Sequence, residues 1–108
     1  MSKAAIDHVK DIGPPGNTDH TGSNGSDMNA RIGMHGTWES TIGENIDFGN
    51  SSAIEILINL LVDDGVPDRG HRTNIFNEQF KVCGVGYGYH KNFKHCCVID
   101  YAGGFTEL

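Results

Sequence analysis

The sequence predicts an α+β domain, and three observations support this. Stretches with helical periodicity come first, and two strand-like runs around a short polar turn follow them, an order typical of helices packed on an antiparallel hairpin. The chain has 108 residues, the size of one domain with one hydrophobic core. Its 15 glycines indicate tight turns and close backbone approaches. We therefore expect a single domain over residues 1–108.

The first part of the chain predicts two short helices joined by a long loop. Residues 4–10 have a helical pattern that Gly13-Pro14-Pro15-Gly16 stops. Residues 13–25 are polar and rich in glycine, and a loop of this length in a small domain is often functional. Ser26 with Asp27 can cap a second helix that runs to Met34.

An extended segment is expected over residues 41–48. Its alternation places Ile42, Glu44, Ile46 and Phe48 on one side. A carboxylate among apolar side chains is a local conflict, and such conflicts often mark functional sites.

The clearest helix begins after Ser52, which forms a capping box with Glu55. Apolar residues cover this helix almost all round, so we expect it to be the buried central helix. It ends at Asp63-Asp64-Gly65. Two acidic residues are unfavourable at the negative end of the helix dipole, so we expect a positively charged partner to face them.

A β-hairpin is predicted at the C-terminal end, from strands over residues 82–89 and 95–101. In the first strand Gly84, Gly86 and Gly88 share one face. Because glycine has no side chain, this face allows a helix or the preceding loop to press close to the sheet.

Composition excludes several classes of partner. The net charge is −6 and no run of Lys or Arg is present, so we expect no nucleic acid and no anionic membrane surface as partner. No apolar run approaches the length of a membrane span, and the start does not have the pattern of a signal peptide. Three cysteines, Cys83, Cys96 and Cys97, leave at least one thiol free or paired with another molecule, and a disulfide from Cys83 to either of the others stays open.

The six histidines differ in their surroundings. Helix-packing, helix-end or turn roles suit four of them, His8, His35, His90 and His95, although the last two could also form a metal pair across the hairpin. The other two, His20 and His71, lie in polar loops beside glycine, where an imidazole is open to solvent or metal. No His-Glu-x-x-His pattern strengthens a metal site.

Taken in order, several motifs resemble the CAP superfamily, the group of cysteine-rich secretory, antigen 5 and pathogenesis-related proteins. They are Gly43-Glu44-Asn45-Ile46, Gly70-His71-Arg72-Thr73-Asn74-Ile75, the upstream His20, and the closing runs 83–88 and 98–102. The resemblance covers about residues 4–105. It implies a three-layer α-β-α sandwich with an antiparallel sheet, in which the family's first helix is missing or shortened.

The resemblance also implies a cleft. His20 and His71 would hold zinc or another divalent cation, and the cleft acids would be Glu44 and one of Asp63 or Asp64. This chemistry is sensible because imidazole suits zinc and a nearby carboxylate can orient bound water. Members of the superfamily are mostly secreted, with lipid, sterol or protein partners. We therefore expect a secreted binding or signalling module without turnover.

Two alternatives stay open at this stage. The first is a metal-dependent hydrolase with Glu44 as general base. The second is a structural subunit of a larger assembly, in which a partner or a second copy covers the face left by the missing helix.

Overall fold

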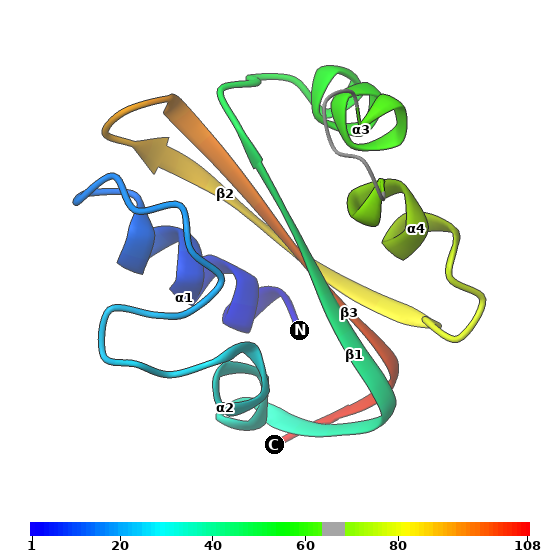
Figure 1. The fold of residues 1–108 in the computed structure, drawn as a ribbon. Coiled ribbons are helices and arrows are strands. Elements are labelled where there is room, and N and C mark those ends of the chain that lie inside the picture. Colours follow the sequence, from blue (N-terminus) through cyan, green and yellow to red (C-terminus); the bar gives the residue numbers. More distant parts are fainter. Residues whose placement is uncertain (64–68) are drawn as a thin grey trace.

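A three-stranded antiparallel sheet forms the middle of the molecule, and helices lie on both of its faces (Figure 1). The protein was analysed as a computed structural model, which describes residues 1–63 and 69–108. Along the chain the elements are α1 (Ser2–Ile12), α2 (Met28–Gly33), β1 (Gly36–Phe48), α3 (Ala53–Val62), α4 (Gly70–Phe76), β2 (Val82–His90) and β3 (Lys94–Glu107). The predicted α+β class is confirmed.

The layers follow the order helix, sheet, helix. Helices α1 and α2 lie on one side of the sheet, and α3 and α4 lie on the other (Figure 1). The three-layer α-β-α arrangement implied by the resemblance is therefore confirmed.

The strand order is β1-β3-β2, so the last strand is central. The predicted hairpin is confirmed, since β2 pairs with β3 from Val82 opposite Ala102 to His90 opposite Lys94. Strand β3 is longer than the prediction because its second half pairs with the start of β1, with Gly36 opposite Glu107. The extended segment expected over residues 41–48 likewise begins earlier, at Gly36.

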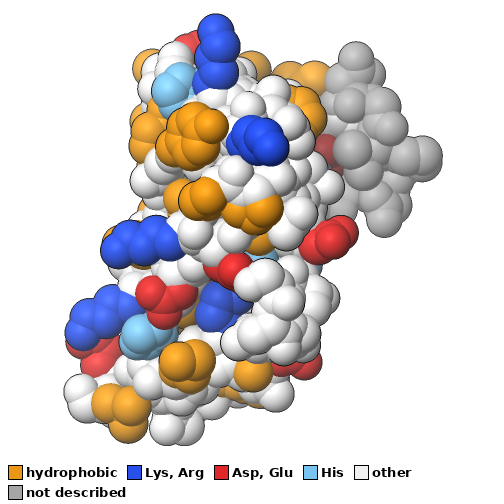
Figure 2. Space-filling model, turned by 90° about the vertical axis from the view of Figure 1, so that its left-hand side faces the viewer, with side chains coloured by type: hydrophobic (Ala, Val, Ile, Leu, Met, Phe, Trp, Pro, Cys, Tyr) orange, Lys and Arg blue, Asp and Glu red, His pale blue; other side chains and the backbone are white. Residues whose placement is uncertain are grey.

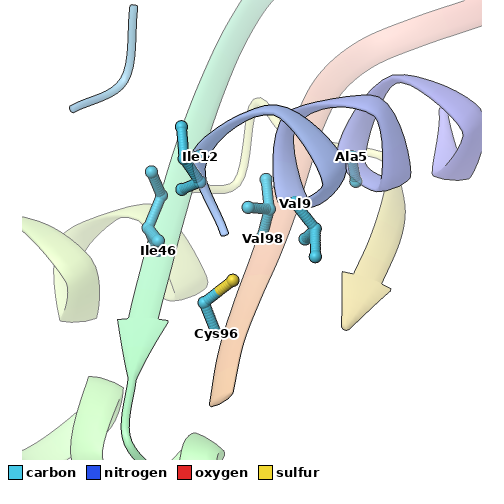
Figure 3. Close-up of a cluster of buried hydrophobic side chains, with 6 residues drawn as sticks. All are labelled: Ala5, Val9, Ile12, Ile46, Cys96 and Val98. Atoms are coloured by element: carbon cyan, nitrogen blue, oxygen red, sulfur yellow. The ribbon is translucent and has the colours of Figure 1, made fainter. Parts of the chain in front are cut away.

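The largest cluster of the core lies between α1 and the sheet. It is formed by the buried residues Ala5, Val9, Ile12, Ile46, Cys96 and Val98 (Figure 3). The glycine face of β2 explains how close α1 comes. A Cβ on Gly86 would lie 2.6 Å from the backbone carbonyl carbon of Ala5, which is closer than real Cβ contacts come. The close approach predicted for these glycines is confirmed, with α1 as the approaching helix.

The expectation that α3 is the buried central helix is wrong. Only Ile56 and Leu60 are buried on it, whereas Ile54, Leu57 and Ile58 are about half exposed or more. The helix packs on the sheet by one narrow stripe, which contacts Cys97 of β3. The predicted N-cap is confirmed, since the Ser52 hydroxyl accepts from the amide of Glu55. The apolar pattern predicted the helix correctly, but it did not predict how much of the helix surface other elements cover.

Two further sequence expectations concern thiols and membranes. Cys83 is exposed and Cys96 and Cys97 are buried, and all three are free thiols. Among the described residues, no helix has both the length and the apolar character that a membrane crossing requires.

Candidate functional site

A cavity of about 410 Å³ opens where the loop after α1 meets the end of β1 and the α3–α4 region. It is lined by Thr18, His20, Ile46, Asp47, Phe48, Asn59, Leu60, Asp63, His71 and Phe93. The two histidines singled out in the sequence therefore border one cavity, although they lie 51 positions apart in the chain. Of the expected acids, Asp63 lines the cavity and Glu44 lies behind His20.

His20 is held by a carboxylate from the sheet. Its Nδ1 lies 2.7 Å from Oε1 of Glu44. The side chain of Glu44 is almost fully buried, whereas that of His20 is 57% exposed. Strand β1 turns Glu44 toward α1 and α2 with Ile46, as its alternation predicted. The buried carboxylate thus fixes one edge of an imidazole whose other edge stays accessible.

Arg31 of α2 is the partner that sequence reasoning missed. Its Nη1 donates to Oε2 of Glu44 at 2.5 Å, and its Nη2 donates to the backbone oxygen of His20 at 2.7 Å. The side chain is 5% exposed. One guanidinium therefore holds both the carboxylate and the loop that carries the imidazole. The helical spacing of Arg31 was visible in the sequence, but the fact that it points at the carboxylate was not.

A second buried acid, Asp100 of β3, completes this cluster, with its Oδ2 3.8 Å from Nη1 of Arg31. Burial, followed by the neighbouring Glu44, raises the pKa of Asp100 to about 9. Burial would also raise the pKa of Glu44, but its interactions with His20, Asp100 and Arg31 outweigh it and lower that pKa to about 2. At neutral pH Glu44 is therefore ionised and Asp100 is protonated. The carboxyl group of Asp100 faces this cluster, and neither of its oxygens has a hydrogen-bond partner among the described residues.

His71 has its own carboxylate. Its Nδ1 lies 2.9 Å from Oδ1 of Asp63, and its backbone amide donates to Oδ2 at the same distance. Asp63 sits at the end of α3 with φ 52°, a left-handed conformation that Asp tolerates better than most residues. Burial opposes ionisation of Asp63, but its bonds to His71 and Arg72 prevail and lower its pKa. The other expected acid, Asp64, lies outside the described residues.

The positive partner expected at the end of α3 is present. Arg72 donates from Nε to the carbonyl of Leu61 and from Nη2 to that of Val62. Helix-terminal carbonyls lack intrahelical partners, so this contact stabilises the end of the helix. With His71 beside Asp63, the first residues of α4 offset the acidic end of α3.

Two asparagines join the two histidine segments. Asn74 donates to the backbone oxygen of Glu44 and to the side-chain oxygen of Asn45. Asn45 in turn donates to the backbone oxygen of His71. The Gly-Glu-Asn and Gly-His-Arg-x-Asn motifs are thus parts of one hydrogen-bond network. It sets the position of His71 relative to the strand that holds His20.

The donor set suits a divalent cation in one respect. A histidine that ligates a metal usually donates its other ring nitrogen to a carboxylate or carbonyl, as Nδ1 of both His20 and His71 can here. Nε2 of each ring then remains for a ligand in the cavity. Across residues 1–63 and 69–108, however, no group of three or more His, Cys, Asp or Glu side chains is arranged to hold a metal. A cation here would rest on two imidazoles and water.

The arrangement is unsuited to a general base at Glu44. Both of its oxygens are hydrogen-bonded, the residue is 7% exposed, and its low pKa makes it a weak proton acceptor. Two carboxylates line the cavity itself: Asn59 and Asn50 donate to Asp47, and Asp63 pairs with His71.

A three-layer sandwich with a histidine and carboxylate cavity at one end of its sheet defines a CAP-type domain. The family model for the cysteine-rich secretory protein family, CAP, matches residues 1–101, and the chain belongs to this family. No curated protein matches the sequence.

A solved structure supports the fold. It is the 1.5 Å crystal structure of an extracellular protein containing a SCP domain from Bacillus anthracis str. Ames, with a TM-score of 0.70 and 25% sequence identity. The match covers 94% of this chain and 30% of that protein, so the chain spans less than a third of the longer protein's length.

Proposed function

We propose that this CAP domain is a binding module whose cavity holds a divalent cation, such as zinc, through Nε2 of His20 and Nε2 of His71. The pairing of each Nδ1 with a carboxylate, Glu44 for one and Asp63 for the other, carries the proposal. These pairings orient both rings and raise the basicity of the nitrogens that face the ligand. Two protein ligands leave coordination positions open for water or for a group on a partner molecule.

The module acts by binding rather than by turnover. A hydrolase would need a carboxylate free to accept a proton, and Glu44 is occupied by His20 and Arg31. The cavity wall combines polar groups with the apolar side chains of Phe48, Leu60 and Phe93. Such a lining suits a partner group that is polar at the histidines and apolar beyond them, as expected of a lipid, a sterol or a protein side chain.

Secretion is part of the proposal. The matching family is described as secretory, and the similar protein from Bacillus anthracis is extracellular. A leader segment on the natural gene product and recovery of the protein outside cells would support this location; recovery from the cell interior would contradict it.

Calorimetric titration with zinc chloride tests the cation site. We compare wild type with His20→Ala, His71→Ala and the double variant, and use His35→Ala as the matched control because His35 pairs with Asp7 away from the cavity. Each cavity variant should bind at least about tenfold more weakly, while the control keeps the wild-type affinity. Equal affinity in wild type and the double variant would rule out the site.

One observation favours a second candidate function, a subunit of an assembly. An apolar groove of about 410 Å³ runs between α3 and strands β2 and β3, lined by Ser51, Ala53, Ile56, Leu57, Val85, Tyr87, Cys97 and Ile99. No lining residue is charged, so the groove does not select a charged partner, and a second copy using the same face would suit it. Sedimentation equilibrium should then show a dimer that Leu57→Glu dissociates. A monomer at all concentrations would reject this candidate.

A further inference from the structure

Two tripeptides in this chain have the pattern Asn-x-Ser, in which x is not proline. They are Asn24-Gly25-Ser26, between α1 and α2, and Asn50-Ser51-Ser52, between β1 and α3. This pattern is the acceptor for N-linked glycans in chains that enter the secretory pathway. A glycan is bulky and hydrated, so the folded chain accommodates it only where the asparagine amide faces solvent. The surroundings of each asparagine therefore distinguish the two tripeptides.

Asn24 lies in an exposed turn, and its amide nitrogen is free to be modified. Its Oδ1 accepts from the backbone amide of Ser26 at 3.0 Å, whereas Nδ2 has no hydrogen bond among the described residues. The next residue, Gly25, is exposed as well, and a Cβ placed on it would meet no atom within 4 Å. A sugar on Nδ2 therefore displaces no hydrogen bond of the turn and extends into solvent.

Asn50 is held in the opposite way. Its Nδ2 donates to both carboxylate oxygens of Asp47, at 3.1 and 3.0 Å, and Asp47 is 2% exposed. A glycan replaces one of the two amide hydrogens, so it would remove a donor from a buried carboxylate, which costs free energy. The hydroxyl of Ser52, the third residue of this tripeptide, accepts from the amide of Glu55 as the N-cap of α3. A glycan on Asn50 would thus disrupt the packing at the start of α3.

The two positions also differ in what a glycan would cover. Asp47 lines the histidine cavity and Ser51 lines the apolar groove, so a sugar on Asn50 would stand beside both binding surfaces. Asn24 lines neither of them and belongs to the loop between α1 and α2, across the sheet from α3 (Figure 1). Figure 2 views the side of the molecule that carries α1 and α2, where uncharged polar side chains and backbone, drawn in white, make up much of the surface. A glycan on Asn24 therefore leaves the cavity and the groove open.

We propose that Asn24 is an N-glycosylation site, modified when the chain passes through the secretory pathway, and that Asn50 stays unmodified; this inference rests on the proposed secretion of the domain. The donor is an oligosaccharide carried on a polyprenyl pyrophosphate. A bond forms between Nδ2 of Asn24 and the anomeric carbon of the first sugar, while the bond from that carbon to the pyrophosphate oxygen breaks. The amide proton passes to the departing pyrophosphate. Oδ1 keeps its hydrogen bond from Ser26, because the product is still an amide.

Expression in insect cells behind a cleavable secretion leader tests the site. Removal of the leader shows that a chain has entered the secretory lumen, so leader-cleaved chain is scored both in the medium and inside the cells. A peptide N-glycosidase should raise the electrophoretic mobility of this chain and convert Asn24 to aspartate. Peptide mass spectrometry reads the conversion. The digestion is carried out in heavy-oxygen water, because only conversion by the enzyme during digestion then carries the label, whereas earlier spontaneous deamidation of Asn24-Gly25 does not.

Variants locate the glycan. Asn24→Gln and Ser26→Ala should each abolish the mobility change, and Ser26→Thr should retain it, since the acceptor pattern needs a hydroxyl two residues after the asparagine. Asn50→Gln is the matched control in the second tripeptide and should leave the change in place.

Leader-cleaved wild type without a glycan on Asn24 would overturn the proposal, and so would a glycan on Asn50. Because the leader is supplied, this result is separate from the test of secretion. An unmodified Asn24 in leader-cleaved chain contradicts the glycosylation site alone, whereas recovery of the natural protein from the cell interior contradicts the proposed secretion.

Discussion

Nδ1 of His20 and Oε1 of Glu44 lie 2.7 Å apart, which joins an exposed loop to a buried position in the sheet. The contact depends on Arg31, which binds the same carboxylate and the backbone oxygen of His20. The geometry of the cavity therefore rests on charges in the protein interior, where removing one partner leaves another without compensation. Single substitutions in the cluster of His20, Glu44 and Arg31 should therefore lower stability even where they preserve the shape of the side chain.

Glu44→Gln should destabilise the fold by about 3 kcal/mol, because it removes the negative charge that compensates the buried guanidinium of Arg31. Urea unfolding at neutral pH measures the change. Glu39→Gln is the matched control, since it makes the same change on the same strand at an exposed position, and it should cost less than about 0.5 kcal/mol. Equal stability of Glu44→Gln and wild type would mean that Arg31 does not depend on this charge.

Asp100 should make the free energy of unfolding fall as the pH rises, the opposite of the usual effect of a carboxylate. Its pKa is raised to about 9 in the folded chain, so the folded state keeps a proton that the unfolded chain releases near its ordinary pKa of 3.8. Stability from this group is present below pH 3.8 and is lost as the pH rises toward 9, with an upper limit of about 1.4 kcal/mol per pH unit.

Asp100→Asn replaces the protonated carboxyl by a neutral amide of similar shape. Urea unfolding between pH 5 and pH 8.5 should show wild type losing stability as the pH rises, whereas the variant should have a flatter profile and be the more stable of the two at pH 8. Parallel profiles for the two proteins would show that Asp100 does not retain its proton on folding. Glu44 contributes in the opposite sense, because its pKa is lowered to about 2 and its stabilisation fades only in acid.

Asp63→Asn should weaken zinc binding about tenfold to a hundredfold while the fold is retained. Asn tolerates the left-handed backbone that this position adopts, so the end of α3 is preserved. His71 loses the ionised partner of its Nδ1. Competition with a chelating dye measures the affinity, and Asp27→Asn is the control because Asn also serves as the N-cap of α2. A zinc affinity unchanged by Asp63→Asn would argue that His71 is not a ligand.

Sequence patterns predicted the helices and strands of this fold well, but they predicted less well what each element packs against. The N-cap at Ser52, the hairpin and the glycine face of β2 are local features with local causes, and each is present in the structure. The placement of His20 and His71 at one cavity came from the ordered motifs, since spacing alone does not bring two loops together. Arg31 was missed because no sequence pattern shows that the arginine of one helix contacts Glu44, which lies on a strand 13 positions further along the chain.

Gly86→Ala should destabilise the chain by about 1–3 kcal/mol, because its Cβ would meet the backbone of Ala5 at 2.6 Å and push α1 from the sheet. Gly33→Ala is the matched control. A Cβ there meets no atom within 4 Å, and alanine favours helix by up to about 1 kcal/mol over glycine. Thermal unfolding should therefore rank Gly33→Ala at or above wild type and Gly86→Ala below it. The reverse order would mean that α1 does not pack on β2 as described.

Two leucines of α3 test how far that helix is covered. Leu60 is 2% exposed and contacts Cys97 and Ile56, so Leu60→Ala should cost about 2–5 kcal/mol. Leu57 is 48% exposed beside the apolar groove, so Leu57→Ala should cost less than about 1 kcal/mol in a dilute sample. Urea unfolding at two protein concentrations measures both. If Leu57→Ala costs as much as Leu60→Ala, and more so at the higher concentration, this side of α3 is covered by a second copy in solution. If the loss of stability in Leu57→Ala is small and does not depend on protein concentration, this side of α3 is exposed to solvent.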